Sequence, residues 1–246
     1  MKHLALTLAL AFLCIDAHGQ TLVNTAVGGD TTGSTFANFS TNAVSTTATN
    51  SVIACARVSD TGITLTWSDT ALDTFVSQVN VDDGSTILNC STIASSAGNA
   101  SNVYKITPSS GTVRYVGMAV RQYSGANTGS LVDVHASTTG AFTGGTITSS
   151  AYTTTSANEV AVVFATIEQL SVTYSAGTGF GNVTQVPSGA SNGIAGMEDR
   201  TYTSTQSGVT APFVTTGGNA WIMAVVTLKA SSGGGGVVRR RANVIQ

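Results

Sequence analysis

The amino-acid sequence predicts an all-β protein, a two-sheet β-sandwich of jelly-roll kind with mostly antiparallel strands. Apolar and polar residues alternate with a period of two along many segments, as expected for strands with one buried face. Helix-capping signals are absent. Short stretches rich in Gly, Ser, Asn and Pro separate the apolar segments and predict turns.

The clearest strand candidates lie in the middle and at the end of the chain. SVIACARVS (51–59) and TVRYVGMAVRQYS (112–124) alternate between two faces. NEVAVVFATIEQ (158–169) and AWIMAVVTLKA (220–230) are apolar almost throughout, which is typical of central strands covered on both sides. The dipeptide Asp83-Gly84 predicts a tight hairpin turn, because glycine accepts a positive φ. No internal repeat of fixed period is visible.

The chain divides into three regions by composition. Residues 1–19 have a basic start, a short apolar run and an Ala-His-Gly ending, which predicts a secretory signal peptide. An alternative is a lipoprotein acylated at Cys14, although Leu13 occupies a position that normally needs a small residue. Residues 20–230 are expected to form the sandwich domain, and residues 231–246 a Gly-rich linker with a basic tail.

The basic tail contains three consecutive arginines. Arg239, Arg240 and Arg241 follow a run of four glycines, Gly233 to Gly236. Such a tail can dock to an anionic surface or be a protease target. The alternative is a solvated tail without a partner.

Composition excludes some classes of protein. Charged residues make up 9% of the chain, the net charge is −2 and the isoelectric point is near 5.8, so nucleic acid is not expected as a partner. The 42% of hydrophobic residues indicates a buried core. No apolar run approaches the roughly 20 residues of a membrane helix, so we expect no transmembrane span and a soluble protein after export.

Two cysteines remain after the signal peptide. Cys55 and Cys90 form an even pair in a chain bound for an oxidising compartment, which predicts a disulfide. The alternative is a pair of buried free thiols.

Several segments resemble bacterial secreted β-sandwich modules of uncertain function. The similar stretches cover most of residues 21–230 and are VGMAVRQYSGANTGSLVD, TTTSANEVAVVFATI, YSAGTGF, GMEDRTY and AWIMAVVTLKA. The resemblance implies a jelly-roll fold and an extracellular location. It brings no catalytic residues.

Asp133 and His135 are the first candidates for chemistry. Side chains two residues apart on a strand share a face, so the acid can orient the imidazole or share a metal. A catalytic zinc usually takes three protein ligands, however, and no other histidine follows the signal peptide. The G-x-S-x-G motif of serine hydrolases is absent. The preferred interpretation is a solvent-facing strand pair.

Glycoside hydrolysis requires two carboxylates beside the sugar. The candidates are Glu159, Glu168, Glu198 and Asp199, which do not form a clustered acidic strand motif. Glu159 is expected at the solvated end of a core strand. Glu198, Asp199 and Arg200 are expected to form an exposed charge patch.

Sugar binding requires exposed aromatic rings and a few hydrogen-bonding side chains. The predicted ligand-binding residues are Trp67, Tyr152 and Tyr202, in a chain rich in Asn, Ser and Thr. Calcium can bind oxygen ligands in loops, and Asp82 and Asp83 are the candidates. A plain hairpin turn is the alternative at these two residues.

The preferred functional prediction is a secreted, non-catalytic binding or surface-adhesion module whose partner is a polysaccharide or another cell-surface component. The second is a structural or assembly subunit of a surface fibre or appendage. The third is a glycoside hydrolase. The sequence predicts no oligomeric state.

Overall fold

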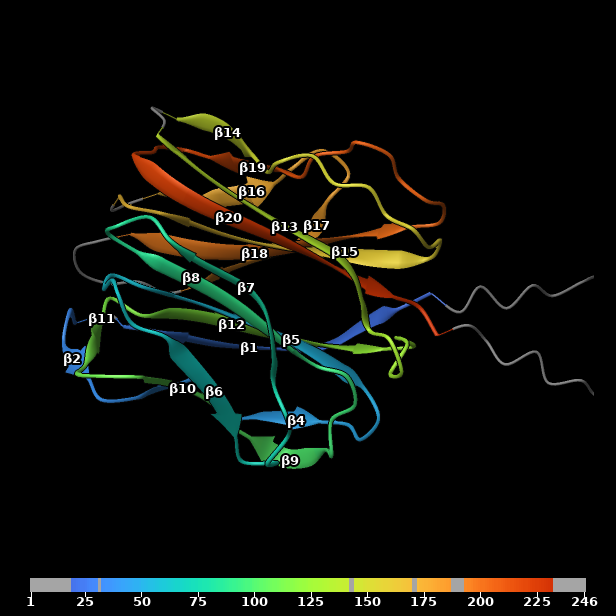
Figure 1. Ribbon diagram of the computed structural model, residues 1–246, viewed down its shortest axis with the longest axis horizontal. Coiled ribbons are helices and arrows are strands. Elements are labelled where there is room, and N and C mark those ends of the chain that lie inside the picture. The colour runs from blue at the N-terminus through green and yellow to red at the C-terminus, as the bar shows by residue number, and fades with distance from the viewer. Residues whose placement is uncertain (1–18, 31, 142–143, 170–171, 187–192, 232–246) are drawn as a thin grey trace, which may run out of the picture.

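A computed structural model describes residues 19–30, 32–141, 144–169, 172–186 and 193–231 (Figure 1). All regular elements in these ranges are β-strands, and all their pairings are antiparallel, which confirms the all-β prediction. No helix in the described part is long and apolar enough to cross a membrane. The predicted signal peptide and the arginine tail lie outside the described residues, apart from Gly19 and Ser231.

The first half of the chain builds a five-stranded sheet with the order β1-β12-β5-β8-β7. Its central strand β5 is buried throughout, because apolar layers cover both of its faces. The strands of this sheet are β1 (Thr21–Gly29), β12 (Gly117–Ser124), β5 (Ser51–Val58), β8 (Ile87–Ile93) and β7 (Val76–Asp82).

The second half builds another five-stranded sheet, with the order β13-β20-β15-β18-β17. The two segments that are apolar almost throughout become its central strands, as the sequence predicts. The strands are β13 (Val132–Ala141), β20 (Ala220–Lys229), β15 (Glu159–Ile167), β18 (Ile194–Tyr202) and β17 (Gly181–Val186).

Smaller sheets cover the outer faces of the two large ones. One three-stranded sheet consists of β3 (Phe39–Ser40), β10 (Tyr104–Pro108) and β6 (Leu65–Asp69). The other consists of β14 (Gly145–Thr148), β19 (Pro212–Thr215) and β16 (Tyr174–Ala176). Two short ladders pair β11 (Val113–Arg114) with β2 (Thr35–Phe36), and β4 (Val44–Thr46) with β9 (Asn99–Asn102).

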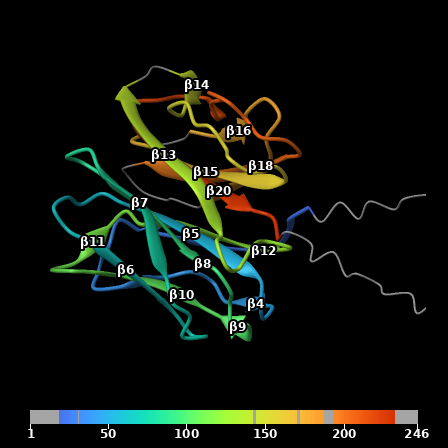
Figure 2. The same cartoon turned by 45° about the vertical axis from the view of Figure 1, so that its right-hand side comes forward.

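Three apolar cores hold these layers together. The central core lies between the two five-stranded sheets and contains Leu88, Phe164 and Met197. One outer core contains Trp67 under the first small sheet, and the other contains Phe213 under the second. The molecule is therefore a sandwich of two large sheets with a further layer on each outer face, and Figure 2 shows the two halves stacked.

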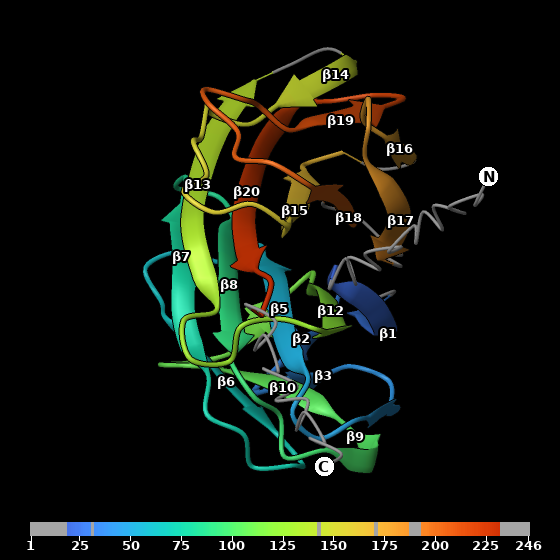
Figure 3. The same ribbon diagram turned by 90° about the vertical axis from the view of Figure 1, so that its right-hand side faces the viewer.

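The two halves repeat one strand order. In each large sheet the first strand of the half, β1 or β13, pairs with the last, β12 or β20. The large sheets contact each other crosswise, β1 with β17, β7 with β13, β12 with β18 and β8 with β20. Figure 3 shows β7 beside β13. Such reciprocal contacts are what a two-fold axis produces, and they place an approximate axis between β5 and β15.

The predicted disulfide is confirmed. Cys55 and Cys90 are opposite each other in the β5–β8 ladder, with their Cα atoms 4.1 Å apart. Both cysteines are buried in the central core. A buried disulfide fits a protein of an oxidising, extracellular environment.

Candidate functional site

The three aromatic residues predicted to bind ligand are buried, which corrects their expected exposure. Trp67 is 6% exposed, and its Nε1–H donates a hydrogen bond to Asn89 Oδ1 at 2.8 Å. Tyr152 and Tyr202 are 5% and 3% exposed, and their hydroxyl groups lie 2.7 Å apart. Trp67 packs into one outer core and the two tyrosines into the other, so none of the three offers an exposed face on which a sugar could stack.

Asp133 and His135 do not form the expected solvent-facing pair. A β-bulge interrupts the β13–β20 ladder between Val132 and His135. The Asp133 carboxylate turns inward and lies 3.3 Å from Lys229 Nζ, whereas His135 is exposed. The bulge therefore separates two side chains that a regular strand would place on one face.

The four candidate carboxylates lie in different surroundings, as the lack of a clustered motif predicts. Glu159 and Glu198 are fully buried, and Asp199 is buried in an ion pair with Arg121, with Oδ2 at 3.1 Å from Nη1. The expected solvated end at Glu159 and the expected exposed patch at Glu198 and Asp199 are therefore corrected. Glu168 and Asp199 line two different pockets, so no two of these carboxylates share one.

The candidate calcium ligands instead accept hydrogen bonds from the backbone. The Asp82 carboxylate accepts from the N–H groups of Gly62 and Gly84, at 2.8 and 2.9 Å. Asp83 Oδ1 accepts from the N–H groups of Ser85 and Thr86. These bonds stabilise the hairpin turn between β7 and β8. In the described ranges, no three His, Cys, Asp or Glu side chains are grouped to hold a metal ion.

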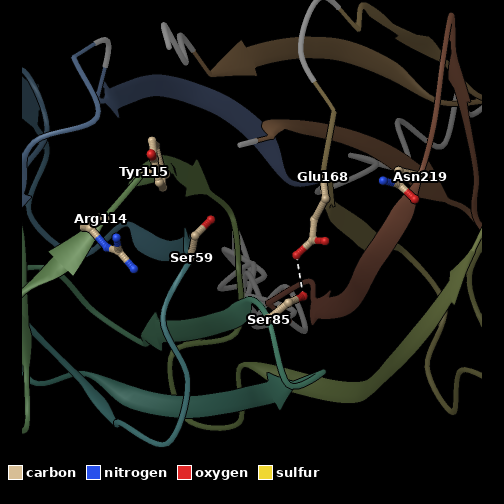
Figure 4. Close-up of a pocket in the computed structure, with 6 residues that line it drawn as sticks. All are labelled: Ser59, Ser85, Arg114, Tyr115, Glu168 and Asn219. Atoms are coloured by element: carbon tan, nitrogen blue, oxygen red, sulfur yellow. Dashed lines mark hydrogen bonds between the residues drawn. The ribbon is translucent and has the colours of Figure 1, made fainter. Parts of the chain in front are cut away.

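A polar pocket lies at the end of the sandwich where both halves meet. We call it the end pocket (Figure 4); its volume is about 310 Å³. Arg114, Tyr115 and Ser59 lie on one side of it, and Glu168 and Asn219 on the other, with Ser85 below Glu168. The lining residues are Ser59, Ser85, Arg114, Tyr115, Glu168 and Asn219.

The end pocket is built from equivalent positions of the two halves. Ser59 follows β5, and Glu168 follows the corresponding strand β15. Arg114 and Tyr115 come just before β12, and Asn219 comes just before the corresponding strand β20. The pocket therefore lies at the end of the approximate two-fold axis. Junctions between structural units are common places for ligand pockets.

Hydroxyl groups hold the Glu168 carboxylate in the pocket wall. Glu168 Oε1 accepts a hydrogen bond from Thr86 Oγ1 at 2.6 Å and another from Ser85 Oγ. The side chain is half-buried and lines the pocket. Glu168 thus supplies an oriented anion.

Two arginines supply positive charge to the pocket. The Arg114 side chain is 50% exposed and pairs only loosely with Asp60, at 3.8 Å. Arg57 is fully buried and donates hydrogen bonds to the Tyr115 carbonyl at 3.0 Å and to Ser59 Oγ at 2.5 Å. Burial lowers the pKa of Arg57 to about 10, so it remains charged at neutral pH. Arg57 positions the pocket wall, and Arg114 lines the pocket.

Tyr115 has an unusual backbone conformation. Its φ is +48°, in the left-handed region that residues with side chains rarely adopt. This angle ends β11 and separates it from β12, so the long strand predicted over 112–124 is interrupted. Non-glycine residues with such angles cluster at functional sites. The half-buried Tyr115 ring is the aromatic face that the pocket offers.

Sequence reasoning identified only Glu168 among the lining residues. The other five are polar or aromatic residues at strand ends, and the sequence alone does not show which strand ends meet. The chain matches no protein-family model, and neither curated proteins nor solved structures give a match. Function is therefore inferred from the site.

Proposed function

We propose that the protein is a secreted, non-catalytic carbohydrate-binding module and that the end pocket binds a sugar unit of a polysaccharide or cell-surface glycan. The observation that carries this proposal is the lining of the pocket. It combines a carboxylate, a guanidinium, an amide, two serine hydroxyls and one tyrosine ring. Its volume suits a single sugar unit, near the lower limit of about 300–1,000 Å³ for ligand pockets.

The chemistry of a sugar matches this lining. Sugar hydroxyls both donate and accept hydrogen bonds, so Glu168 can accept from them while Arg114 and Asn219 donate. Hydrogen bonds to charged groups are the stronger ones. The apolar C–H face of a sugar ring can pack on Tyr115, which replaces the three buried rings in this role.

The repeated strand order, for which we propose a jelly-roll topology in each half, supports the proposal. The second half has eight principal strands, β13 to β20, divided into sheets of five and three. Its first strand lies beside its last, as in jelly rolls, a fold that includes lectins. The buried disulfide supports export to an oxidising compartment.

Affinity electrophoresis of the full chain against a panel of polysaccharides tests the proposal. We expect one glycan to retard the protein. Asn219→Ala and Arg114→Gln should each weaken binding about tenfold, because each removes a hydrogen bond worth about 1.4 kcal/mol. Lys105→Gln, which removes an exposed cation from β10 on an outer sheet, is the control and should bind as the wild type does.

Two results would contradict the proposal. One is the absence of retardation by any glycan in the panel. The other is a glycan bound equally well by the wild type and by both pocket variants, which would move the site elsewhere on the molecule.

A second function, assembly into a surface fibre, is favoured by apolar exposure near the edge strand β7. Leu72 is 89% exposed and Val76 is 55% exposed. Leu72 also has a left-handed φ of +61°. Light scattering on the same samples distinguishes the two functions, because an assembly subunit forms large particles that Leu72→Ser should reduce.

A further inference from the structure

Lys229, Asp133 and Glu159 meet on three neighbouring strands of the second large sheet. β20 lies between β13 and β15, and Lys229 is directly opposite Glu159 in the β15–β20 ladder. On the other side, the ladder with β13 is irregular just after the pair Val132–Leu228, and the Asp133 side chain there reaches the Lys229 ammonium group. Lys229 Nζ lies 3.3 Å from Asp133 Oδ1. An amine and a carboxyl group are therefore in contact at the end of the sheet.

Burial restricts water at this contact. The side chain of Asp133 is 3% exposed and that of Lys229 is 23% exposed. Glu159 is fully buried, and neither of its oxygen atoms has a hydrogen-bond partner of normal geometry among the described residues. Burial, followed by the neighbouring Asp133, raises the pKa of Glu159 to about 7. Near neutral pH, Glu159 can therefore both accept and donate a proton.

Thr155 polarises the Asp133 carboxyl group. Its backbone N–H donates to Oδ2, and its hydroxyl group donates to Oδ1. These donors are placed to stabilise negative charge that develops on the carboxyl oxygens during nucleophilic attack. Against the opposing effect of burial, the same bonds help to lower the pKa of Asp133 to about 2, so its carboxyl group is an anion before the attack.

We propose that Lys229 and Asp133 condense to an intramolecular isopeptide bond, with Glu159 transferring the proton. Glu159 takes a proton from the Lys229 ammonium group, and the neutral Nζ attacks Asp133 Cγ. The N–C bond forms and one C–O bond breaks. Glu159 passes this proton, and then a second proton from the bonded nitrogen, to the departing oxygen, which leaves as water. An ammonium and a carboxylate thus become one amide and one water, and no further reactant is needed.

The bond would join the first and last strands of the second half, because β13 begins this half and β20 ends it. The first half already has a covalent link, the Cys55–Cys90 disulfide. With the isopeptide bond, each large sheet would contain one cross-link between neighbouring strands. Such links restrict the unfolded chain and resist pulling on the chain ends.

Mass spectrometry of the folded full chain after disulfide reduction tests the bond. We expect the measured mass to be lower, by the mass of one water molecule, than the mass calculated for the same chain without the bond. Trypsin should leave Lys229 uncleaved, and the peptide 122–200 should remain joined to the peptide that begins at Thr201. Glu159→Gln should abolish the water loss, because the amide cannot carry the proton.

Variants of the reacting pair control for folding. Lys229→Arg keeps the charge but cannot form the bond, so it should show the full mass with an unchanged circular dichroism spectrum. Glu198→Gln, which alters another buried carboxyl on the same face, should retain the water loss. Separate, unmodified peptides 122–200 and 201–229 from the folded wild type would overturn the proposal. So would a water loss that persists in Lys229→Arg.

Discussion

At the scale of single residues, buried charged side chains of the first half interact with charged side chains of the second half. Arg121 on β12 pairs with Asp199 on β18, and Tyr123 donates its hydroxyl hydrogen to the same carboxylate at 2.6 Å. At the other end of the central core, Arg57 lies close enough to Glu168 for their charges to interact. Buried charges need such partners, because desolvation otherwise costs several kcal/mol.

Glu198 should make stability depend on pH. It accepts a hydrogen bond from the Gly177 N–H at 2.9 Å, while its other oxygen atom is buried with no hydrogen-bond partner among the described residues. Burial raises its pKa to about 8, against the opposing effects of Gly177 and Arg121, and nearby Asp199 raises it further. Between pH 4.5 and about 8, the folded state therefore holds a proton that the unfolded state has lost.

The contribution of Glu198 to the free energy of unfolding should accordingly fall as pH rises through that window, and should stay constant above it. Glu198→Gln, which is neutral at every pH, should flatten the decline. Urea unfolding at several pH values within the window measures this decline in the free energy of unfolding. A decline equally steep in the variant would show that Glu198 is not its source.

At the scale of single elements, the disulfide links β5 to β8 inside the central core. Every residue of both strands is buried, and the two cysteines face each other across the ladder. The linked residues are 35 apart in the chain. Closing a loop of this length stabilises a protein by about 4 kcal/mol in the chain-entropy model.

Replacing both cysteines by alanine should therefore lower the free energy of unfolding by about 4 kcal/mol. Guanidinium unfolding under oxidising conditions measures the loss. A reductant should destabilise the wild type by a similar amount and leave the double variant unchanged. Equal unfolding midpoints for the oxidised wild type and the double variant would contradict this role.

Sequence patterns located several elements well. The segments 51–59, 158–169 and 220–230 become β5, β15 and β20 almost residue for residue. Gly84 has the positive φ, +89°, expected for the hairpin turn. The predicted long strand 112–124 was less accurate, because the left-handed backbone at Tyr115 interrupts it, and nothing in the alternation of apolar residues signals this break.

At the scale of the whole molecule, the central core should make the two halves unfold together. Residues from both large sheets fill this core, and Arg121 and Asp199 connect the sheets at one end of it. Two units with a large apolar interface behave as one, whereas units with a small polar interface remain independent. The repeated strand order alone would permit two separate transitions.

Calorimetry should show one unfolding transition in the wild type. Asp199→Asn should lower stability by about 3–5 kcal/mol, because Arg121 then remains buried without its counter-ion. Tyr123→Phe, which removes only one hydrogen bond to Asp199, should cost about 1 kcal/mol. Two well-separated transitions in the wild type would show that the halves are independent.

The sequence by itself determined the class of fold, the main central strands, the hairpin turn at Gly84 and the pairing of Cys55 with Cys90. Each depends on local periodicity, on local turn chemistry or on the presence of only two cysteines after the predicted signal peptide. Only the tertiary structure decided which aromatic rings are covered, that the strand order repeats, and which side chains meet at the end pocket and around Lys229. These features depend on contacts between residues far apart in the chain, and period-two alternation specifies which residues are apolar but not which strands become neighbours.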